Sequence, residues 1–95
     1  MGTVTKADLV LDVYERHGGL SKNDVHDIVN LVFEHIKEKL INKEDVQLWG
    51  FGSFKVKHKH ARRVLVPKSG AEAIVSERYI ISFQPGKNLL ERFSI

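Results

Sequence analysis

The 95-residue sequence contains no cysteine, two prolines, one tryptophan and no long apolar run. The lack of cysteine excludes disulfides, thiolate zinc sites and cysteine nucleophiles, and it fits a reducing compartment. The apolar runs are too short to cross a bilayer, and the N-terminus lacks the apolar core of a signal peptide. We therefore expect a soluble cytoplasmic protein with no membrane partner.

Motifs of catalysis and cofactor binding are also missing. The sequence has no P-loop, no Rossmann fingerprint, and no serine, histidine and aspartate at a recognisable spacing. His58 and His60 invite a metal-site interpretation, but no acidic residue or third ligand lies near them in the sequence. Partial protonation at about pH 6–7, which strengthens phosphate binding, is the better explanation. The sequence thus predicts a protein that is not an enzyme and has no metal, cofactor or small-molecule substrate.

Charge is unevenly distributed along the chain. Residues 1–45 carry six Lys/Arg and nine Asp/Glu, a net charge of −3, whereas residues 46–95 carry nine Lys/Arg and three Asp/Glu, a net charge of +6. This asymmetry predicts an acidic half that builds a scaffold and a basic half that contacts an anion.

A row of lysines stands out in the basic half. Gly-Phe-Gly-Ser-Phe at residues 50–54 is followed by Lys55, Lys57 and Lys59 at every second position. Alternate side chains of a strand share one face, so a strand here carries a cationic stripe. Taken alone, the stripe has two interpretations: a solvated face that protects a sheet edge, or a surface that binds nucleic-acid phosphates.

Local signals predict the helices and strands. Thr5 and Ser21 are N-caps, with Asp8 and Asp24 three residues later. A glycine pair at residues 18–19 ends the first helix, so the two helices form a hairpin. The predicted helices run from Thr5 to the glycine pair, from Ser21 to about residue 41, and over 88–93. The predicted strands begin at residue 46, run from 53 to about 63, and run over 74–83, with a turn at 67–70.

This order predicts an α+β fold in one domain over residues 1–95. We expect a helical hairpin base at about 5–45, a three-stranded antiparallel sheet with a long β-ribbon arm at about 46–85, and a short C-terminal helix at about 86–93. A two-stranded ribbon is only marginally stable, and a chain this short buries a modest core. Part of the ribbon is therefore expected to be ordered on a partner, and the core to be completed by dimerisation.

The aromatic residues of the basic half are assigned mainly to packing. Phe51, Phe54 and Phe83 are expected in the core, because they accompany the predicted strands. Trp49 precedes the Gly-Phe-Gly turn and is expected to pack as well, with base stacking as the alternative.

Four short motifs then occur in a specific order. Gly-Phe-Gly-Ser-Phe at 50–54, Ala-Arg at 61–62, Pro-x-x-Gly at 67–70 and Phe-x-Pro-Gly-Lys at 83–87 resemble the bacterial HU and integration host factor family of histone-like DNA-binding proteins, over about residues 5–92. The resemblance implies an intertwined dimer whose helices form a base and whose two arms wrap the minor groove of double-stranded DNA. It also implies a place in the bacterial nucleoid.

The resemblance assigns DNA contacts position by position. Lys57 and Lys59 match basic positions of the outgoing arm strand, and Pro67 matches the proline that wedges between base pairs and kinks the duplex. For Lys6, exposure to solvent without any DNA contact is an equal alternative. The expected DNA-binding residues are Lys6, Gly52, Ser53, Lys55, Lys57, Lys59, Arg62, Arg63, Pro67, Lys68, Ser69, Gly70, Arg78 and Lys87.

The arm tip departs from the family pattern. It reads Leu65-Val66-Pro67 where members usually have Arg-Asn-Pro, and Val64 replaces a usual glycine. Either the apolar tip is a larger wedge, or it has lost its groove contacts and docks on protein or leaves the DNA unbent. Losing the arginine should weaken electrostatic affinity and any preference for a narrow groove.

The sequence therefore predicts an architectural protein that binds the DNA backbone and minor groove as a dimer, with weak sequence specificity, and that bends DNA or stabilises bent DNA. A homodimer is expected, and a heterodimer with a paralogue is also open. Within this class, shape-based recognition of particular sites is the second interpretation. The alternative from another class is an HU-fold dimer that coats DNA without bending it or serves as a protein-interaction or regulatory module.

Overall fold

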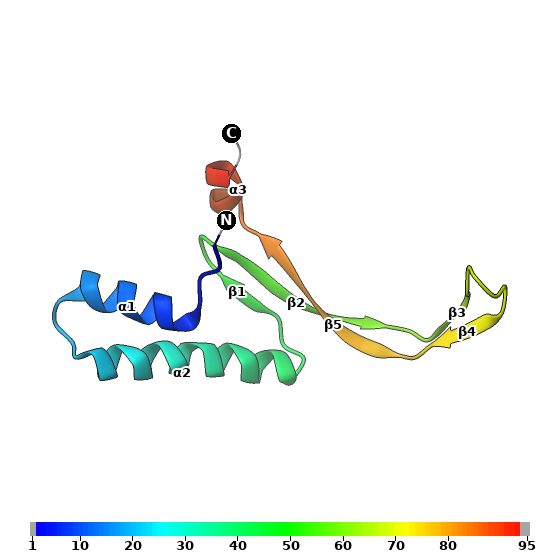
Figure 1. Cartoon of the computed structure of the whole chain (residues 1–95), viewed down its shortest axis with the longest axis horizontal. Coiled ribbons are helices and arrows are strands. Elements are labelled where there is room, and N and C mark those ends of the chain that lie inside the picture. Colours follow the sequence, from blue (N-terminus) through cyan, green and yellow to red (C-terminus); the bar gives the residue numbers. More distant parts are fainter. Residues whose placement is uncertain (1, 94–95) are drawn as a thin grey trace. The chain divides into compact units, whose positions relative to one another are not determined.

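The computed structural model describes residues 2–93 and contains, within them, three helices and five strands. In chain order these are α1 (Lys6–His17), α2 (Lys22–Ile41), β1 (Val46–Leu48), β2 (Gly52–Lys59), β3 (Arg62–Leu65), β4 (Glu72–Val75), β5 (Arg78–Pro85) and α3 (Lys87–Phe93) (Figure 1). The chain divides into two compact units, Met1–Glu38 and Lys39–Ile95. No helix within residues 2–93 is both long enough and apolar enough to cross a membrane.

Side-chain caps set the ends of the two N-terminal helices, as the sequence predicted. The Thr5 hydroxyl accepts a hydrogen bond from the Asp8 N–H at 3.3 Å, and the Asp8 carboxylate accepts one from the Thr5 N–H at 2.9 Å. The Asp8 carboxylate accepts hydrogen bonds from the Thr5 N–H and, at 3.0 Å, from the Thr5 hydroxyl, and these two bonds, the backbone one first, hold the pKa of Asp8 below its usual 3.8. Gly18 ends α1 in the left-handed conformation, at φ 75°, and the Ser21 hydroxyl caps α2 by accepting from the Asp24 N–H at 3.1 Å.

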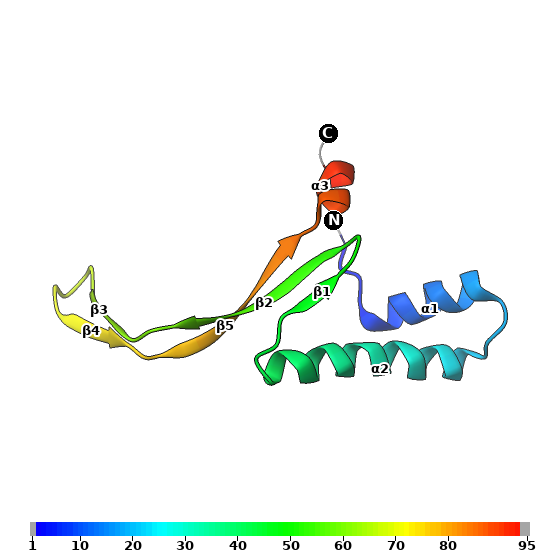
Figure 2. The same ribbon diagram turned by 180° about the vertical axis from the view of Figure 1, so that it is seen from behind.

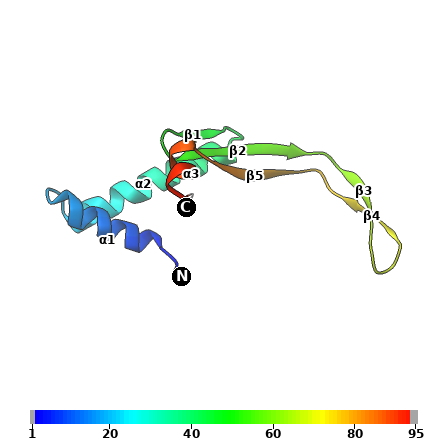
Figure 3. The same ribbon diagram turned by 90° about the horizontal axis from the view of Figure 1, so that it is seen from above.

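Little of the helical hairpin is buried, although α1 and α2 lie side by side (Figures 1 and 3). Val10 of α1 and Val25 of α2 are the only buried apolar side chains among the described residues of the whole chain. Leu31 is 70% exposed, and Leu11 and Val32 are also exposed. Ile28 and Phe33 of α2 are exposed too, so the single chain leaves much of the apolar surface of this helix uncovered.

The strands form two antiparallel sheets. The first has the order β1-β2-β5, and the second pairs β3 with β4. Figures 2 and 3 show β2 and β5 leading into β3 and β4 as one long ribbon. The first ladder ends at the pair Lys59–Arg78 and the next begins at Arg62–Val75, so two residues on each strand interrupt it. The α+β fold class is confirmed, and the strand predicted from 53 to about 63 is corrected to two strands, β2 and β3, interrupted at residues 60–61.

The pairing of β2 with β5 separates two kinds of side chain. In an antiparallel ladder, directly opposed residues point to the same face. One face, here called the apolar face, carries the pairs Phe54–Phe83, Val56–Ile81 and His58–Tyr79. The opposite face carries the lysines of β2 and is called the basic face.

The apolar face packs only in part within one chain. The Phe83 ring centroid lies 5.0 Å from that of Phe54 and 5.2 Å from that of Phe51. Phe51 and Phe83 are nevertheless exposed, and Ile81 is 61% exposed. The prediction of a phenylalanine core is thus right about the cluster and wrong about its burial in the single chain.

The close approach of β2 to β5 depends on a glycine. Gly52 is buried, and a Cβ atom at this position would lie 2.6 Å from the Gln84 carbonyl oxygen and 2.6 Å from the Phe83 ring. Both distances are far below van der Waals contact. The start of β2 can therefore carry no side chain unless the two strands separate.

Gly52→Ala is expected to destabilise the protein by about 1–3 kcal/mol, the usual cost of overpacking an interior. Urea unfolding followed by circular dichroism measures the loss. Gly2→Ala is the matched control, because it adds the same methyl group in open space. An unchanged unfolding midpoint for Gly52→Ala would show that the strands part freely.

Candidate nucleic-acid interface

The basic face is built by strand alternation. Lys55, Lys57 and Lys59 point to one side of β2, away from the apolar face, and Arg78 of β5 pairs directly with Lys59. Like charges placed opposite each other on a ladder repel. A polyanion lying on this face would relieve that repulsion, so the arrangement favours an anionic ligand.

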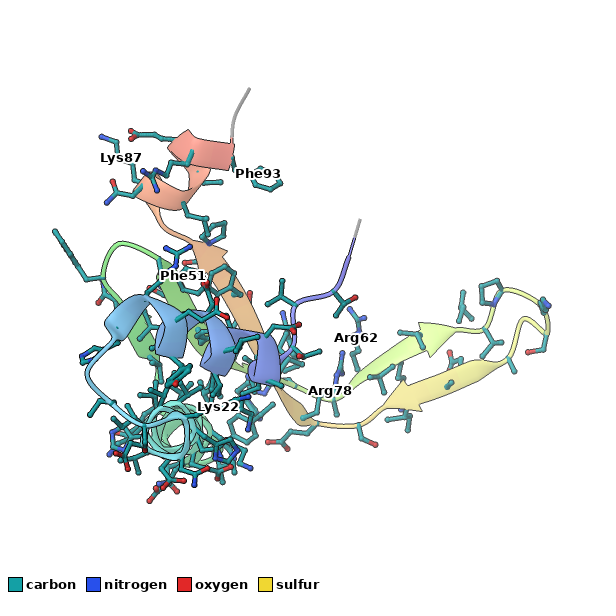
Figure 4. The ribbon with its side chains drawn as sticks, turned by 60° about the vertical axis from the view of Figure 1, so that its left-hand side comes forward. Lys22, Phe51, Arg62, Arg78, Lys87 and Phe93 are labelled. Atoms are coloured by element: carbon teal, nitrogen blue, oxygen red, sulfur yellow. The ribbon has the colours of Figure 1, made fainter. Side chains whose placement is uncertain are left out.

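A hollow lined by cations lies beyond the end of this ladder. Lys59, His60, Arg62 and Arg78 line a space of about 300 Å³, here called the basic notch. Figure 4 shows Arg62 and Arg78 close together, at the break between the two paired segments. No acidic residue is among the four that line the notch. The notch can therefore hold an anionic group such as a phosphate oxygen.

The two histidines have neighbours that the sequence did not reveal. Strand pairing brings Glu77 to His58, and the two side chains form a hydrogen bond. The expectation that no acidic residue lies near the histidines is therefore wrong, because the pairing joins residues 19 positions apart. The His58 ring also contacts those of Tyr79 and His60, with centroids 5.1 and 4.4 Å away. Among the described residues, no group of three or more His, Cys, Asp or Glu side chains could hold a metal ion.

The predicted turn at the ribbon tip is confirmed. The Val66 N–H donates to the Ala71 carbonyl at 2.8 Å, and the Val66 carbonyl accepts from the Gly70 N–H at 2.9 Å. Gly70 has φ 68°, which favours glycine, and the Ser69 hydroxyl accepts from the Ala71 N–H at 3.3 Å. Pro67 is exposed at the start of the turn, and Lys68, Ser69 and Gly70 are exposed as well.

The β3–β4 segment does not continue a purely basic face. Arg62 and Arg63 point to opposite sides of β3, and Arg63 lies 4.0 Å from the Glu72 carboxylate. Leu65 and Ile74 share the face of Arg63 and are 69% and 71% exposed. The outer ribbon therefore mixes paired charges with exposed apolar side chains, whereas the lysines of the inner ribbon share one face.

A second hollow lies at the other end of the basic face. It has a volume of about 270 Å³ and is called the β1–β2 hollow. Ser53 and Lys87, both expected DNA-binding residues, are brought together in it, and Lys87 is the first residue of α3 (Figure 4). Its remaining lining residues are Gln47, Leu48, Trp49, Gly50, Gly52, Gly86 and Asn88.

Sequence reasoning missed several residues of these hollows. Gln47 and Asn88 line the β1–β2 hollow, and His60 lines the basic notch. Strand pairing places Gln47 opposite Ser53. The alternation of Val46, Gln47 and Leu48 already indicated that Gln47 lies on the face opposite to the two apolar residues. Trp49 is 95% exposed, so the expectation that it packs is wrong for the single chain.

Two expected site residues have structural roles of their own. The Lys6 ammonium donates to the Asn30 side-chain oxygen at 2.9 Å and lies 5.9 Å from the centre of the Phe33 ring, so it joins α1 to α2. Gly52 is buried, and its packing against β5 already explains the glycine. DNA contact by these two residues stays a prediction.

A basic strand face that leads into a long ribbon is typical of proteins that bind the nucleic-acid backbone. Comparison with protein families agrees with this class, because the family model described as "Bacterial DNA-binding protein" matches residues 4–94. The chain belongs to that family.

Individual relatives place the chain near HU and integration host factor. Integration host factor subunit alpha of Marinomonas sp. (strain MWYL1) is 39% identical over 89 residues, which cover 94% of this chain and 90% of the relative. The same subunit of Stutzerimonas stutzeri (strain A1501) is 38% identical over 92 residues, covering 97% and 91%. The resemblance that the motifs predicted is confirmed.

Solved structures agree with this placement. Anabaena HU, in a cocrystal structure with DNA, superposes with a TM-score of 0.79 and 26% identity, covering 96% of this chain and 98% of that chain. A mutant HU from Thermotoga maritima gives a TM-score of 0.69 and 31% identity, covering 96% and 100%.

Lys59→Gln is expected to stabilise the free ribbon at low salt by roughly 0.2–1 kcal/mol, because it removes the charge opposite Arg78. Added salt should abolish the gain by screening. Hydrogen exchange of the β2 and β5 amides at two salt concentrations measures this effect. The control is Lys37→Gln, which breaks a 3.1 Å ion pair with Glu34 on α2 and should leave these amides unchanged. Faster exchange in Lys59→Gln at low salt would contradict the repulsion.

Proposed function

We propose that this protein is an architectural, nucleoid-associated protein that binds double-stranded DNA as a dimer. The observation that carries the proposal is the separation of a basic face from an apolar face on the same pair of strands. Lys55, Lys57, Lys59 and Arg78 lie on the basic face, and the basic notch continues it. The Anabaena HU structure, which contains DNA, supports this assignment.

Dimerisation is supported by the apolar surface that the single chain leaves uncovered. Exposed apolar side chains include Leu31 of α2, and Phe51 and Ile81 of the second unit. A monomer rarely exposes this much apolar surface without a partner. The bacterial relatives are named as subunits of integration host factor. We therefore infer a dimer of this chain with itself, and a paralogous partner is the alternative.

Weak sequence specificity follows from the residue types on the basic face. Lysine ammonium groups bind phosphates as point charges, and a phosphate contact carries no information about the base. Each phosphate contact adds about 0.9 to the slope of log affinity against log salt, so binding should weaken steeply as salt rises. Selectivity should favour pre-bent, nicked or flexible duplexes, whose deformation costs least.

Bending is assigned to the ribbon tip. Pro67 is exposed at the start of the turn, next to Val66 and close to Leu65. Minor-groove proteins insert apolar side chains such as proline and leucine between base steps and so kink the duplex. The apolar tip is therefore an enlarged wedge, and the inner ribbon supplies the charge.

A duplex with dyes at its two ends is expected to show rising FRET as the protein binds, because bending brings the ends together. Anisotropy measured on the same samples reports binding independently. Raising the salt should reduce both signals in parallel. Binding with unchanged FRET would contradict bending, and absence of binding at low salt would contradict the DNA-binding function.

The second candidate function is a protein-interaction or regulatory module. Leu65 and Ile74, 69% and 71% exposed on one face of the outer ribbon, favour it. In that case the tip docks on a protein, and any DNA that binds to the basic face stays straight.

Leu65→Arg separates the two candidates. If the tip enters the minor groove, the added cation should raise DNA affinity several-fold and steepen the salt slope by about one. Leu65→Gln is the control, because it removes the apolar side chain without adding charge. Equal DNA affinity for Leu65→Arg and the parent protein would favour the protein-docking tip.

A further inference from the structure

Trp49 is the most exposed large apolar residue of the described chain, with 95% of its surface open. It is also the only tryptophan of the sequence. Trp49 stands at the turn between β1 and β2 and is one of the residues that line the β1–β2 hollow, together with Ser53 and Lys87. It therefore lies at the end of the basic face, where a bound duplex would pass.

Hydrogen bonds hold the walls of this hollow in place. The Phe51 N–H donates to the Leu48 carbonyl at 3.0 Å and closes the turn. The Phe51 carbonyl accepts from the Gly86 N–H at 2.8 Å, so the turn is tied to the segment that leads into α3. Gly50, at φ 82°, allows the tight backbone between them. The hollow is thus formed before any ligand binds.

The lining of the hollow matches the parts of a nucleotide. The flat indole can stack on a planar ring. The side chains of Gln47, Ser53 and Asn88 supply hydrogen-bond donors and acceptors for the edge of such a ring. Lys87 supplies an ammonium group 3.9 Å from the Glu91 carboxylate, and its side chain is 86% exposed, so it remains available to a phosphate. No residue that lines the hollow is acidic.

The size of the hollow favours a single nucleotide. Its volume of about 270 Å³ is close to the lower end of ligand pockets, roughly 300 Å³. Bases of an intact duplex are stacked on their neighbours and offer no free face to an indole. Only an unpaired base can lie on Trp49 and present its edge to the amides.

We propose that the β1–β2 hollow binds one unpaired nucleotide of the bound DNA, stacked on Trp49. This inference rests on the proposed DNA-binding function and adds a second selectivity to it. The arm would favour duplexes that bend easily, whereas the hollow would favour duplexes that carry an unpaired base.

The test uses a fully paired duplex and a series of otherwise identical duplexes, each with one extra unpaired nucleotide at a different position. Tryptophan fluorescence and DNA anisotropy are read together. At one or more positions, the parent protein should bind about five- to a hundred-fold more tightly than to the paired duplex, the range expected for one base–aromatic stack. Its tryptophan emission should be quenched more strongly at those positions.

Two variants identify the source of the preference. Trp49→Ala should lose it while binding the paired duplex within about twofold of the parent protein. Trp49→Phe, which keeps a flat ring, should retain most of it. Phe93→Ala is the control, because Phe93 is another exposed aromatic residue and does not line the hollow.

Three results would overturn the proposal. A preference that survives Trp49→Ala would show that flexibility alone selects the unpaired sites. Blue-shifted tryptophan emission in the free protein would show that the partner subunit covers the indole. Quenching of equal size by paired and unpaired duplexes would show contact without stacking. A parent protein that binds no duplex would instead contradict the proposed function itself.

Discussion

The antiparallel register between β2 and β5 decides where every charged and apolar side chain of the inner ribbon lies. Phe54 opposite Phe83 fixes the apolar face, and Lys59 opposite Arg78 fixes the basic face. A slip of one residue would exchange the two faces along β2 and place lysines among the phenylalanines. Gly52 secures this register, because only glycine fits where β2 begins against β5. The proposed DNA surface and the proposed dimer surface both follow from this one constraint.

The same ribbon changes character along its length. The inner part concentrates positive charge, which favours phosphate, and the basic notch marks its end. The outer part exposes Leu65 and Ile74, which favours apolar contact. A protein that binds the DNA backbone with its inner ribbon and inserts the tip between bases needs positive charge on the inner part and apolar side chains on the outer part. The apolar tip therefore fits the DNA-binding function without an arginine, provided that the inner cations supply the affinity.

The fold could be predicted because its signals are local. Caps at Thr5 and Ser21, the glycine turns and the alternating lysines each act within a few residues. The break in the ribbon after Lys59 could not be predicted, because no glycine or proline marks residues 60–61 or 76–77. The hydrogen bond of His58 with Glu77 arises only from strand pairing.

Burial was the least predictable property. Phe51 and Trp49 carry the apolar character of core residues, yet the single chain does not cover either of them. Whether such a residue is covered by its own chain, by a second subunit or by a ligand depends on the assembly. The periodicity of apolar residues in the sequence identifies an apolar face but does not predict what packs on it.

Lysine acetylation with and without duplex, read by mass spectrometry, tests the central claim that one strand face binds DNA. Lys55, Lys57 and Lys59 should be protected by DNA, whereas Lys37 and Lys39 of α2, which are paired with glutamates, should react equally in both samples. Protection of the α2 lysines without protection of the β2 lysines would contradict the assignment of the basic face as the DNA-binding surface.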